Sequence, residues 1–303
     1  MKRAIRVAIP FIVAALVASA CGGAGTSGGA KPAITIGSTN FSEQLILGEL
    51  YSQILEANSY TVTRKFNLGQ CAIVFPALQS GQIDMEVDYL ATLLAFVDKN
   101  APGSTDPKQT AATLQKALES KNVTVLDYAP AVDQNGIVVT KATAGKYKLA
   151  KVSDLAPVAN QLVFGGPPEC PNREFCAIGL KNKYGITFKE FKPLDTGGPL
   201  TVQALVGGQI DVALLFTSDA RIAVRGFVLL EDDKQLQLSD NVAPVVRNDY
   251  LSKAGDDFKK VVNSIAPKLT TAELTGMNKL VEIDKKDPKD VAKEWLKKQG
   301  LIK

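Results

Sequence analysis

The chain has 303 residues, a formal net charge of +4 and a hydrophobic fraction of 46%, a composition that suits a globular protein with a sizeable core. It contains no histidine, which excludes Ser-His-Asp and Cys-His catalysis, histidine-based zinc sites and an imidazole pH switch. Its lysines are interspersed with acidic residues, as in Lys285–Asp290, so no basic surface for nucleic acid is expected.

The first residues have the pattern of an export signal. Basic residues at positions 2, 3 and 6 precede an apolar run over 7–17 that is too short to span a bilayer. The small residues that follow end at Cys21, and this resembles a bacterial lipobox, in which the cysteine becomes the lipidated first residue. An ordinary signal peptide cut near Ala20 is the alternative. We expect a signal peptide at residues 1–20 and an exported protein held at the outer face of the cell membrane by lipid on Cys21.

The segment after this cysteine is rich in glycine. Residues 22–30 contain only Gly, Ala, Ser and Thr, a composition that behaves as a flexible tether. We therefore expect a lipidated cysteine and tether over 21–32. No later segment reaches the length of a transmembrane helix, so the lipid anchor is the only expected contact with the membrane.

The next part of the chain predicts strands and helices in alternation. A β-branched strand is followed by the polar turn Ser38–Ser42, in which Asn40 or Ser42 is expected to cap an amphipathic helix. The last strand of this part is expected to end in a turn at Asp88–Tyr89. The predicted elements are the strands 34–37, 60–66 and 83–87 and the helices 43–57 and 75–79.

An internal repeat indicates a second copy of this plan. The segment Ala77–Asp84 returns as Ala204–Asp211, 127 residues further along (204 − 77 = 127). Each copy reads as the end of a helix, a glycine stop and the start of a buried strand. A repeat at this distance predicts two similar α/β lobes, and the cleft between two lobes is a common place for a small ligand.

The second lobe repeats the order of the first. Strands that alternate with helices favour α/β sheets rich in parallel strands. The nearly apolar strand 210–216 is typical of a sheet covered on both faces. The predicted elements are the strands 161–164, 187–191 and 210–216, the helices 179–184 and 200–205, and the loops 165–176, 195–198 and 217–219.

The C-terminal part, 256–301, is predicted to be helical and to fold back on the first lobe. Thr270 and Glu273 have the spacing of a capping box. Trp295 lies in an apolar stripe at helical spacing, which favours core packing over ligand contact.

Three cysteines remain after Cys21. Cys170 and Cys176 enclose a short loop, and in an oxidising compartment a disulfide is favoured over a metal pair that lacks further ligands. Cys71 is then unpaired. We expect it to be half-buried beside a helix, with a reactive thiol as the alternative.

Candidate ligand contacts follow from the strand ends. In parallel sheets, ligands lie beyond the carboxyl ends of strands, among helix N-termini. This rule selects loops in matching places of the two lobes, which should face one another across the cleft. Asn40, Asp195 and Asp219 have helix capping as an alternative role, and Arg173 has a surface ion pair. The candidates from these loops are Ser38, Asn40, Phe41, Gln70, Arg173 and Thr217.

The segments Ile36–Gln44 and Phe75–Asp84 resemble the osmoprotectant-binding proteins of ABC importers, namely the glycine betaine/carnitine/choline (ProX- and OpuAC-type) substrate-binding proteins. The segments 165–170, 216–219, 230–233 and 287–296 are similar to the same family, and the resemblance covers essentially all of 33–303. It implies an α/β fold of the type II periplasmic-binding-protein class, with two lobes, a ligand cleft, two crossing hinge strands and docking onto a permease. The expected first lobe comprises 33–134 and 240–303, and the second comprises 135–239.

The resemblance also implies roles for individual residues. Tyr89 and Thr92 match a Tyr-Thr-Gly-Thr turn in which the tyrosine is a wall of an aromatic cage and the second threonine contacts the ligand. Leu90 and Ala91 replace the middle of that pattern. The turn therefore keeps the cage wall and the contact but departs from the family between them.

Other cage positions are depleted. Phe216 occupies a position where tight betaine binders often have tyrosine, so the π-face is kept and the hydroxyl is lost. Asn135 occupies a position that is tyrosine in several cage-forming members. Tyr128, near the same crossing segment, is an aromatic residue that could compensate.

The predicted function is therefore that of a monomeric, lipid-anchored binding protein of an ABC importer, with no catalytic residues, metal or cofactor. It would capture a quaternary-amine osmoprotectant such as glycine betaine, choline or carnitine by closure of its lobes and deliver it to permease and ATPase subunits. The alternatives are a receptor for a bulkier or non-quaternary ligand, a histidine-free enzyme on the same fold, and a surface lipoprotein for sensing or adhesion.

Overall fold

The computed structural model describes residues 31–303. The predicted signal peptide at 1–20 and the predicted lipidation site at Cys21 lie outside the described residues. Across 31–303, no helix has both the length and the apolar character needed to cross a bilayer.

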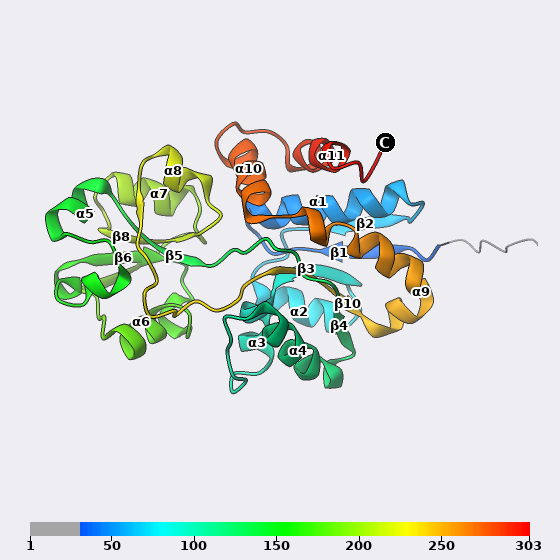
Figure 1. The fold of residues 1–303 in the computed structure, drawn as a ribbon, viewed down its shortest axis with the longest axis horizontal. Coiled ribbons are helices and arrows are strands. Elements are labelled where there is room, and N and C mark those ends of the chain that lie inside the picture. The colour runs from blue at the N-terminus through cyan, green and yellow to red at the C-terminus, as the bar shows by residue number, and fades with distance from the viewer. Residues whose placement is uncertain (1–30) are drawn as a thin grey trace, which may run out of the picture. The chain divides into compact units, whose positions relative to one another are not determined.

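Two five-stranded sheets follow the same plan (Figure 1). In each sheet three neighbouring strands run parallel, and the fourth strand in the order is antiparallel to both of its neighbours. The first sheet has the order β2 (Val62–Lys65), β1 (Ile34–Gly37), β3 (Met85–Tyr89), β10 (Val242–Arg247) and β4 (Val123–Val125). The second has the order β7 (Glu190–Pro193), β6 (Val163–Gly166), β8 (Val212–Phe216), β5 (Asn135–Val139) and β9 (Val228–Leu229).

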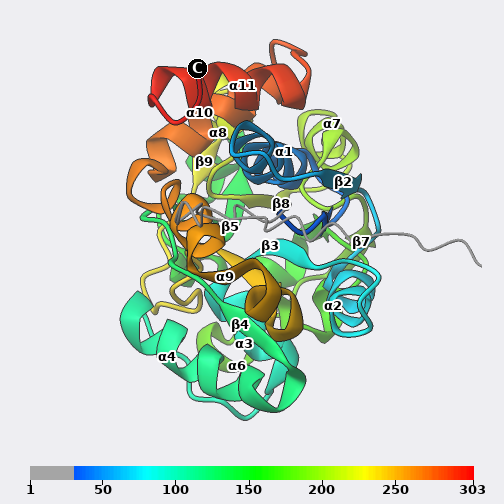
Figure 2. The same cartoon turned by 90° about the vertical axis from the view of Figure 1, so that its right-hand side faces the viewer.

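Helices cover both faces of each sheet. We call the first sheet with α1–α4 and α9–α11 the first lobe, and the second sheet with α5–α8 the second lobe. In the first lobe, buried residues of α1 and the C-terminal helices pack on one face, and those of α2–α4 pack on the other (Figure 2). The helices are α1 (Ser42–Ala57), α2 (Cys71–Gln79), α3 (Leu90–Val97), α4 (Pro107–Leu118), α5 (Lys141–Tyr147), α6 (Ala177–Tyr184), α7 (Pro199–Val206), α8 (Ala220–Val224), α9 (Asn248–Asn263), α10 (Thr271–Glu282) and α11 (Pro288–Lys298).

The antiparallel strand of each sheet enters from the other lobe. Strand β5 follows a segment that leaves the first lobe, and β10 follows a segment that returns from the second. The two segments run antiparallel, with a bridge between Val132 and Asn241 and a hydrogen bond from Asp133 N to Asp240 O of 3.2 Å. The expected pair of crossing strands is thus confirmed.

The internal repeat is confirmed by the positions of its elements. Adding 127 to the bounds of β3 gives those of β8, and α2 and α7 precede these strands in the same way. Gly81 and Gly208 follow the two helices with φ of 80° and 66°, the left-handed conformation that glycine adopts at little cost after a helix. The repeated sequence therefore forms the same helix–turn–strand unit in both lobes.

The C-terminal helices pack on the first lobe, as predicted. Trp295 is buried in the core that α1 forms with these helices, and its Nε1 donates to Glu273 Oε2 at 2.9 Å. Thr270 caps α10 by accepting from the backbone N–H of Glu273. The capping box is incomplete, because the Glu273 carboxylate accepts from the tryptophan and from Lys298.

Two local predictions were wrong. Asp88 and Tyr89 complete β3 and form no turn, because β10 pairs with them and extends the strand. The N-cap of α1 is Phe41, with no side-chain cap. Asn40 accepts from Gln70, and Ser42 donates to Glu282, so neither side chain caps the helix.

Replacing Leu296 by alanine should lower the free energy of unfolding by about 2–5 kcal/mol, because its side chain is fully buried between α11 and α1. The matched control is Leu200→Ala, at a position 59% exposed, where the loss should be below about 0.5 kcal/mol. Denaturant unfolding of both variants measures the difference. Equal effects would show that α11 does not contribute to the core.

Candidate functional site

Three aromatic rings stand in a row where the lobes meet. The Phe41 ring stacks on Phe216 of the second lobe, with centroids 5.0 Å apart, and faces Tyr89 of the first lobe at 6.4 Å. Phe41 precedes α1, Tyr89 ends β3 and Phe216 ends β8. We call these residues the aromatic trio. Tyr89 and Phe216 thus lie at the carboxyl ends of equivalent strands, where α/β sheets bind ligands.

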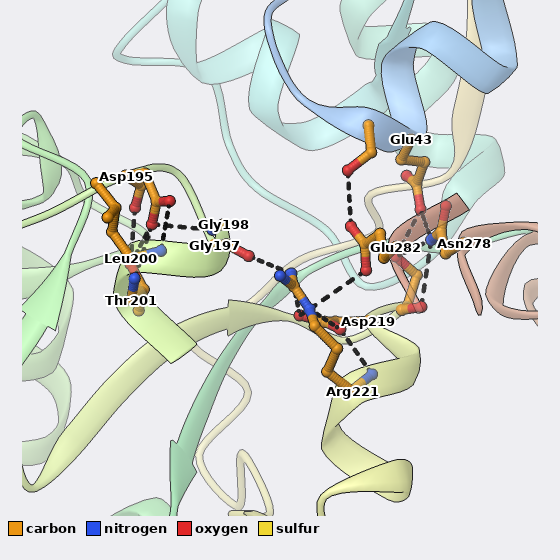
Figure 3. Close-up of polar contacts among 12 residues, drawn as sticks. Glu43, Asp195, Gly197, Gly198, Leu200, Thr201, Asp219, Arg221, Asn278 and Glu282 are labelled. Atoms are coloured by element: carbon orange, nitrogen blue, oxygen red, sulfur yellow. Dashed lines mark hydrogen bonds and ion pairs between the residues drawn. The ribbon is translucent and has the colours of Figure 1, made fainter. Parts of the chain in front are cut away.

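A buried carboxylate lies beside the trio. Glu43, in the first turn of α1, accepts hydrogen bonds from the Tyr89 hydroxyl at 2.5 Å and the Ser218 hydroxyl at 2.6 Å. It also accepts from Asn278 Nδ2 at 2.6 Å (Figure 3). Burial raises the pKa of Glu43, although these three donors oppose the rise. Since Ser218 belongs to the second lobe, Glu43 links the two lobes directly.

Asp133, on a crossing segment, adds a second buried carboxyl group next to Glu43. Its Oδ1 accepts from the backbone N–H of Ser218 at 3.0 Å. Burial, followed by the nearby charge of Glu43, holds the pKa of Asp133 well above its usual range. The crossing segment and the end of β8 therefore lie next to the same pair of buried carboxyl groups, those of Asp133 and Glu43.

An ion-pair network also joins the lobes. Arg221 on α8 binds Asp219 at 2.7 Å and donates to the carbonyl of Gly197 (Figure 3). It lies 3.4 Å from Glu282 at the end of α10. Burial raises the pKa of Glu282 to about 7, with Asp219 adding to the rise and Arg221 opposing it. This network connects a helix of the second lobe with the C-terminal helices of the first.

Asp88 and Asp240 are two further buried acidic residues. Asp240 accepts from the backbone N–H of Thr92 at 2.8 Å and from its hydroxyl at 2.6 Å. Burial raises the pKa of Asp88 to about 7 and that of Asp240 to about 6, and the positive charge of Arg173 opposes both shifts. Arg173 belongs to the second lobe, so its positive charge acts across the boundary between the lobes on Asp88 of the first lobe.

The loop that carries this arginine is closed by a disulfide between Cys170 and Cys176. A short covalent loop limits the conformations of the residues that it encloses. Cys71, by contrast, is a free and half-buried cysteine, and burial together with Asp88 and Glu86 raises the pKa of its thiol. A thiol with a raised pKa stays protonated and is a poor nucleophile.

We call this set of residues, which lie where the two lobes meet, the interlobe seam. It comprises Phe41, Glu43, Asp88, Tyr89, Thr92, Asp133, Arg173, Phe216, Ser218, Asp240 and Asn278. Gln70 also lies here, because its Nε2 donates to Thr196 Oγ1 of the second lobe at 2.9 Å, and Asn40 accepts from the same amide at 3.4 Å. The structure thus brings Asn40, Phe41, Gln70, Tyr89, Thr92, Arg173 and Phe216 together among the predicted contacts.

Three other predicted contacts have local partners. The Ser38 hydroxyl donates to Thr39 O and accepts from Asn67 N, which fixes its own loop. Asn135 donates to Phe175 O, and Thr217 accepts from Gln134 N. Asn135 and Thr217 line a cavity of about 310 Å³ within the second lobe.

Sequence reasoning did not select most of the polar residues of the interlobe seam. Glu43 and Asn278 lie within helices, where a polar residue normally faces solvent. Asp240 precedes a strand with no motif around it. An available signal was the acidic pair in the strand Met85–Tyr89, where burial of carboxylates would be unusual. Among residues 31–303, no group of three or more His, Cys, Asp or Glu side chains is arranged to hold a metal ion.

Comparison with known proteins identifies the family. Residues 32–298 match the family model described as the substrate binding domain of ABC-type glycine betaine transport systems. The carnitine transport binding protein OpuCC of Listeria monocytogenes is 28% identical over 299 residues, covering 96% of this chain and 95% of that protein. The ergothioneine transport permease/ergothioneine binding protein EgtU of Helicobacter pylori is 28% identical over 86% of this chain, which corresponds to 46% of EgtU.

A crystal structure of a glycine betaine/carnitine/choline ABC transporter protein is 30% identical, with a TM-score of 0.72, and covers 88% of this chain and 99% of the solved one. The two-lobed α/β fold with crossing strands therefore matches that of periplasmic binding proteins. The proteins that share this family and fold are binding proteins and not enzymes. Together the match over 32–298 and the shared fold establish that the chain belongs to the family of substrate-binding domains of ABC-type glycine betaine transport systems.

Proposed function

We propose that the protein is the extracytoplasmic receptor of an ABC importer and that it binds a small quaternary-amine solute at the interlobe seam. The aromatic trio, assembled from both lobes, is the observation that carries this proposal. A quaternary ammonium has no N–H to donate, so it is held by π-faces and by negative charge rather than by hydrogen bonds. The seam contains both, because the buried Glu43 carboxylate binds the Tyr89 hydroxyl at 2.5 Å.

The relatives support the same ligand class. One is named for carnitine and one for ergothioneine, and both compounds carry a trimethylammonium group. A receptor for a bulkier or non-quaternary ligand on the same seam is the alternative function. Calorimetric titration with a wider set of amines separates the two functions. Tighter binding of a bulkier or non-quaternary amine than of glycine betaine, carnitine and choline would favour the alternative.

Lobe closure is the proposed mechanism of capture. The contacts from Glu43 to Ser218 and from Gln70 to Thr196 join the lobes, and they exist only when the lobes are together. A ligand that touches Phe41 and Phe216 at once would favour this closed arrangement over an open one. We place the hinge in the crossing segments, which gives a first lobe of 33–134 and 240–303 and a second lobe of 135–239.

Delivery to permease and ATPase subunits, as a monomer anchored by lipid on Cys21, completes the proposal. The lipobox-like sequence before Cys21 and the tether after it support export and anchoring. A short lipid-bound tether would keep the receptor near its permease and raise the local concentration of one for the other.

Phe41→Leu should weaken binding of the preferred quaternary amine about 2- to 30-fold, because it removes one π-face worth about 0.5–2 kcal/mol while keeping an apolar side chain. Phe41→Tyr should bind within about threefold of the parent protein, since the π-face remains. Calorimetric titration with glycine betaine, carnitine and choline measures both variants. Equal binding by the leucine variant would contradict the role of the trio.

The Kd for the quaternary amine should fall about tenfold as the pH rises from 5.5 to 7.5. The carboxyl groups of Asp88 and Asp240 have pKa values raised to about 7 and about 6, so they are partly protonated in the free protein in this range. A bound cation favours their ionised forms and lowers these pKa values, so binding releases protons and is weakened by acid. Titrations in buffers of different ionisation enthalpy measure the protons released. Uptake of protons would contradict this assignment.

Cys21→Ala should move the protein from the membrane fraction to the soluble fraction and abolish labelling by radioactive fatty acid. The matched control is Cys71→Ala, which removes the free cysteine of the described residues and should leave the protein at the membrane. Fractionation of cells that express each variant tests this. Persistence of the Cys21 variant in the membrane would exclude lipid anchoring at this residue.

A further inference from the structure

The second lobe has a groove at the end of its sheet opposite to the interlobe seam. Asn135 of β5 pairs with Phe216 of β8 at the seam, and Val139 pairs with Val212 at the other end of these strands. The groove lies beyond this other end, has a volume of about 440 Å³ and includes no residue of the interlobe seam. Its lining residues are Thr140, Lys141, Ala142, Val206, Arg225, Gly226 and Phe227.

The charged residues that line this groove are cations. Lys141 begins α5 and Arg225 follows α8. Both are exposed, and neither forms an ion pair within residues 31–303. An ideal Cβ placed on Gly226 would lie 3.2 Å from Lys141 Nζ, so the ammonium group lies beside the residue that follows Arg225. Two positive charges without acidic partners therefore meet at one place.

Helix α5 extends this cationic surface away from the groove. The helix contains no acidic residue, and Lys148 follows directly after it. An acidic residue of this neighbourhood is Asp211, whose charge acts on Lys146, while its Oδ2 accepts from the backbone N–H of Val163 at 2.9 Å. Positive charge therefore exceeds negative charge on this part of the lobe. The exposed residues of α5 are Lys141, Ala142, Gly145 and Lys146.

Apolar side chains line the same groove. Val206, the last residue of α7, is 57% exposed, and Phe227 is half-buried. Covering exposed apolar surface is favourable. A small inorganic anion could bind the two cations, but it would leave these apolar groups in water. The groove therefore suits an anionic group that is joined to an apolar part.

We infer that this basic groove binds the phosphate group of an anionic phospholipid at the membrane surface. Arg225 and Lys141 would bind the phosphate oxygens, and Val206 and Phe227 would contact the apolar part of the lipid next to them. An extended acidic peptide fits less well, because the edge strand β9 beside the groove has only two residues with which it could pair. The inference goes beyond the proposed function, since it gives the receptor a contact with the membrane that needs neither the solute nor the lipid on Cys21.

Cosedimentation with lipid vesicles tests the inference on the purified Cys21→Ala variant, which cannot carry lipid at that position. Vesicles of phosphatidylcholine with about one-third phosphatidylglycerol should bind this protein at least about tenfold more tightly than vesicles of phosphatidylcholine alone, because anionic lipid attracts clustered Lys and Arg. Salt at about 1 M should remove the difference, since it shortens the Debye length to about 3 Å. Equal binding to the two kinds of vesicle at low salt would overturn the inference.

Charge reversal in the same background locates the contact. Lys141→Glu and Arg225→Glu should each weaken binding to the anionic vesicles about tenfold. The matched control is Lys253→Glu on α9, which makes the same change in net charge at another exposed lysine and should change vesicle binding less than about twofold. Thermal melting checks that each variant is folded. An equal loss in the Lys253 variant would show that net charge, and not the groove, causes binding.

Two soluble anions separate the lipid from other sources of negative charge. Calorimetric titration with inorganic phosphate and with a peptide of six glutamates should give binding at least about tenfold weaker than that of the anionic vesicles. Tighter binding of either would assign the groove to a soluble anion or an acidic segment and overturn the inference. The groove variants should bind the quaternary amine like the parent protein, so loss of vesicle binding alone leaves the proposed function standing, and loss of amine binding alone leaves this inference standing.

Discussion

Burial of the Glu43 carboxylate is the constraint on which the meeting of the lobes depends. A buried carboxylate is costly unless donors satisfy it, and here the donors come from three distant parts of the chain: Tyr89 at the end of β3, Ser218 after β8 and Asn278 in α10. Each of these elements must be in place before Glu43 is satisfied. The same set of contacts orients the Tyr89 ring beside Phe41, so the polar network and the aromatic trio are one construction.

The two lobes are alike in their sheets and unlike in what surrounds them. The segments that lead into β5 and β10 cross between the lobes and pair with each other in antiparallel fashion. Only the first lobe has the C-terminal helices, and they supply Asn278 and Glu282 to the seam. The repeated halves therefore provide the two sheets, and the unrepeated C-terminal helices provide part of the polar network that joins them.

Much of the fold was predictable because local sequence and local structure agree. The repeated helix–glycine–strand unit, the amphipathic α1 and the buried Trp295 follow from periodicity and glycine placement. The limits of β3 were not predictable, because its last two residues are held in the strand by β10, more than 150 residues away. The capping of α1 was also missed, since Asn40 and Ser42 bond with Gln70 and Glu282 instead. The helices α3, α4, α5 and α8 were not predicted, although Asp106 followed by Pro107 at the start of α4 is a helix-start signal.

The sequence by itself determined the family, the two-lobed plan and the aromatic residues at the strand ends, because these are written in repeats, in periodicity and in short motifs. Only the tertiary structure decided which polar groups meet. Glu43, Asp133, Asp240 and Asn278 come from separate elements, and their spacing along the chain contains no sign of their proximity. The physical reason is that a buried carboxyl group is defined by its surroundings: the same residue is an ordinary solvated acid on a helix surface and a site of raised pKa once a second lobe removes water from it.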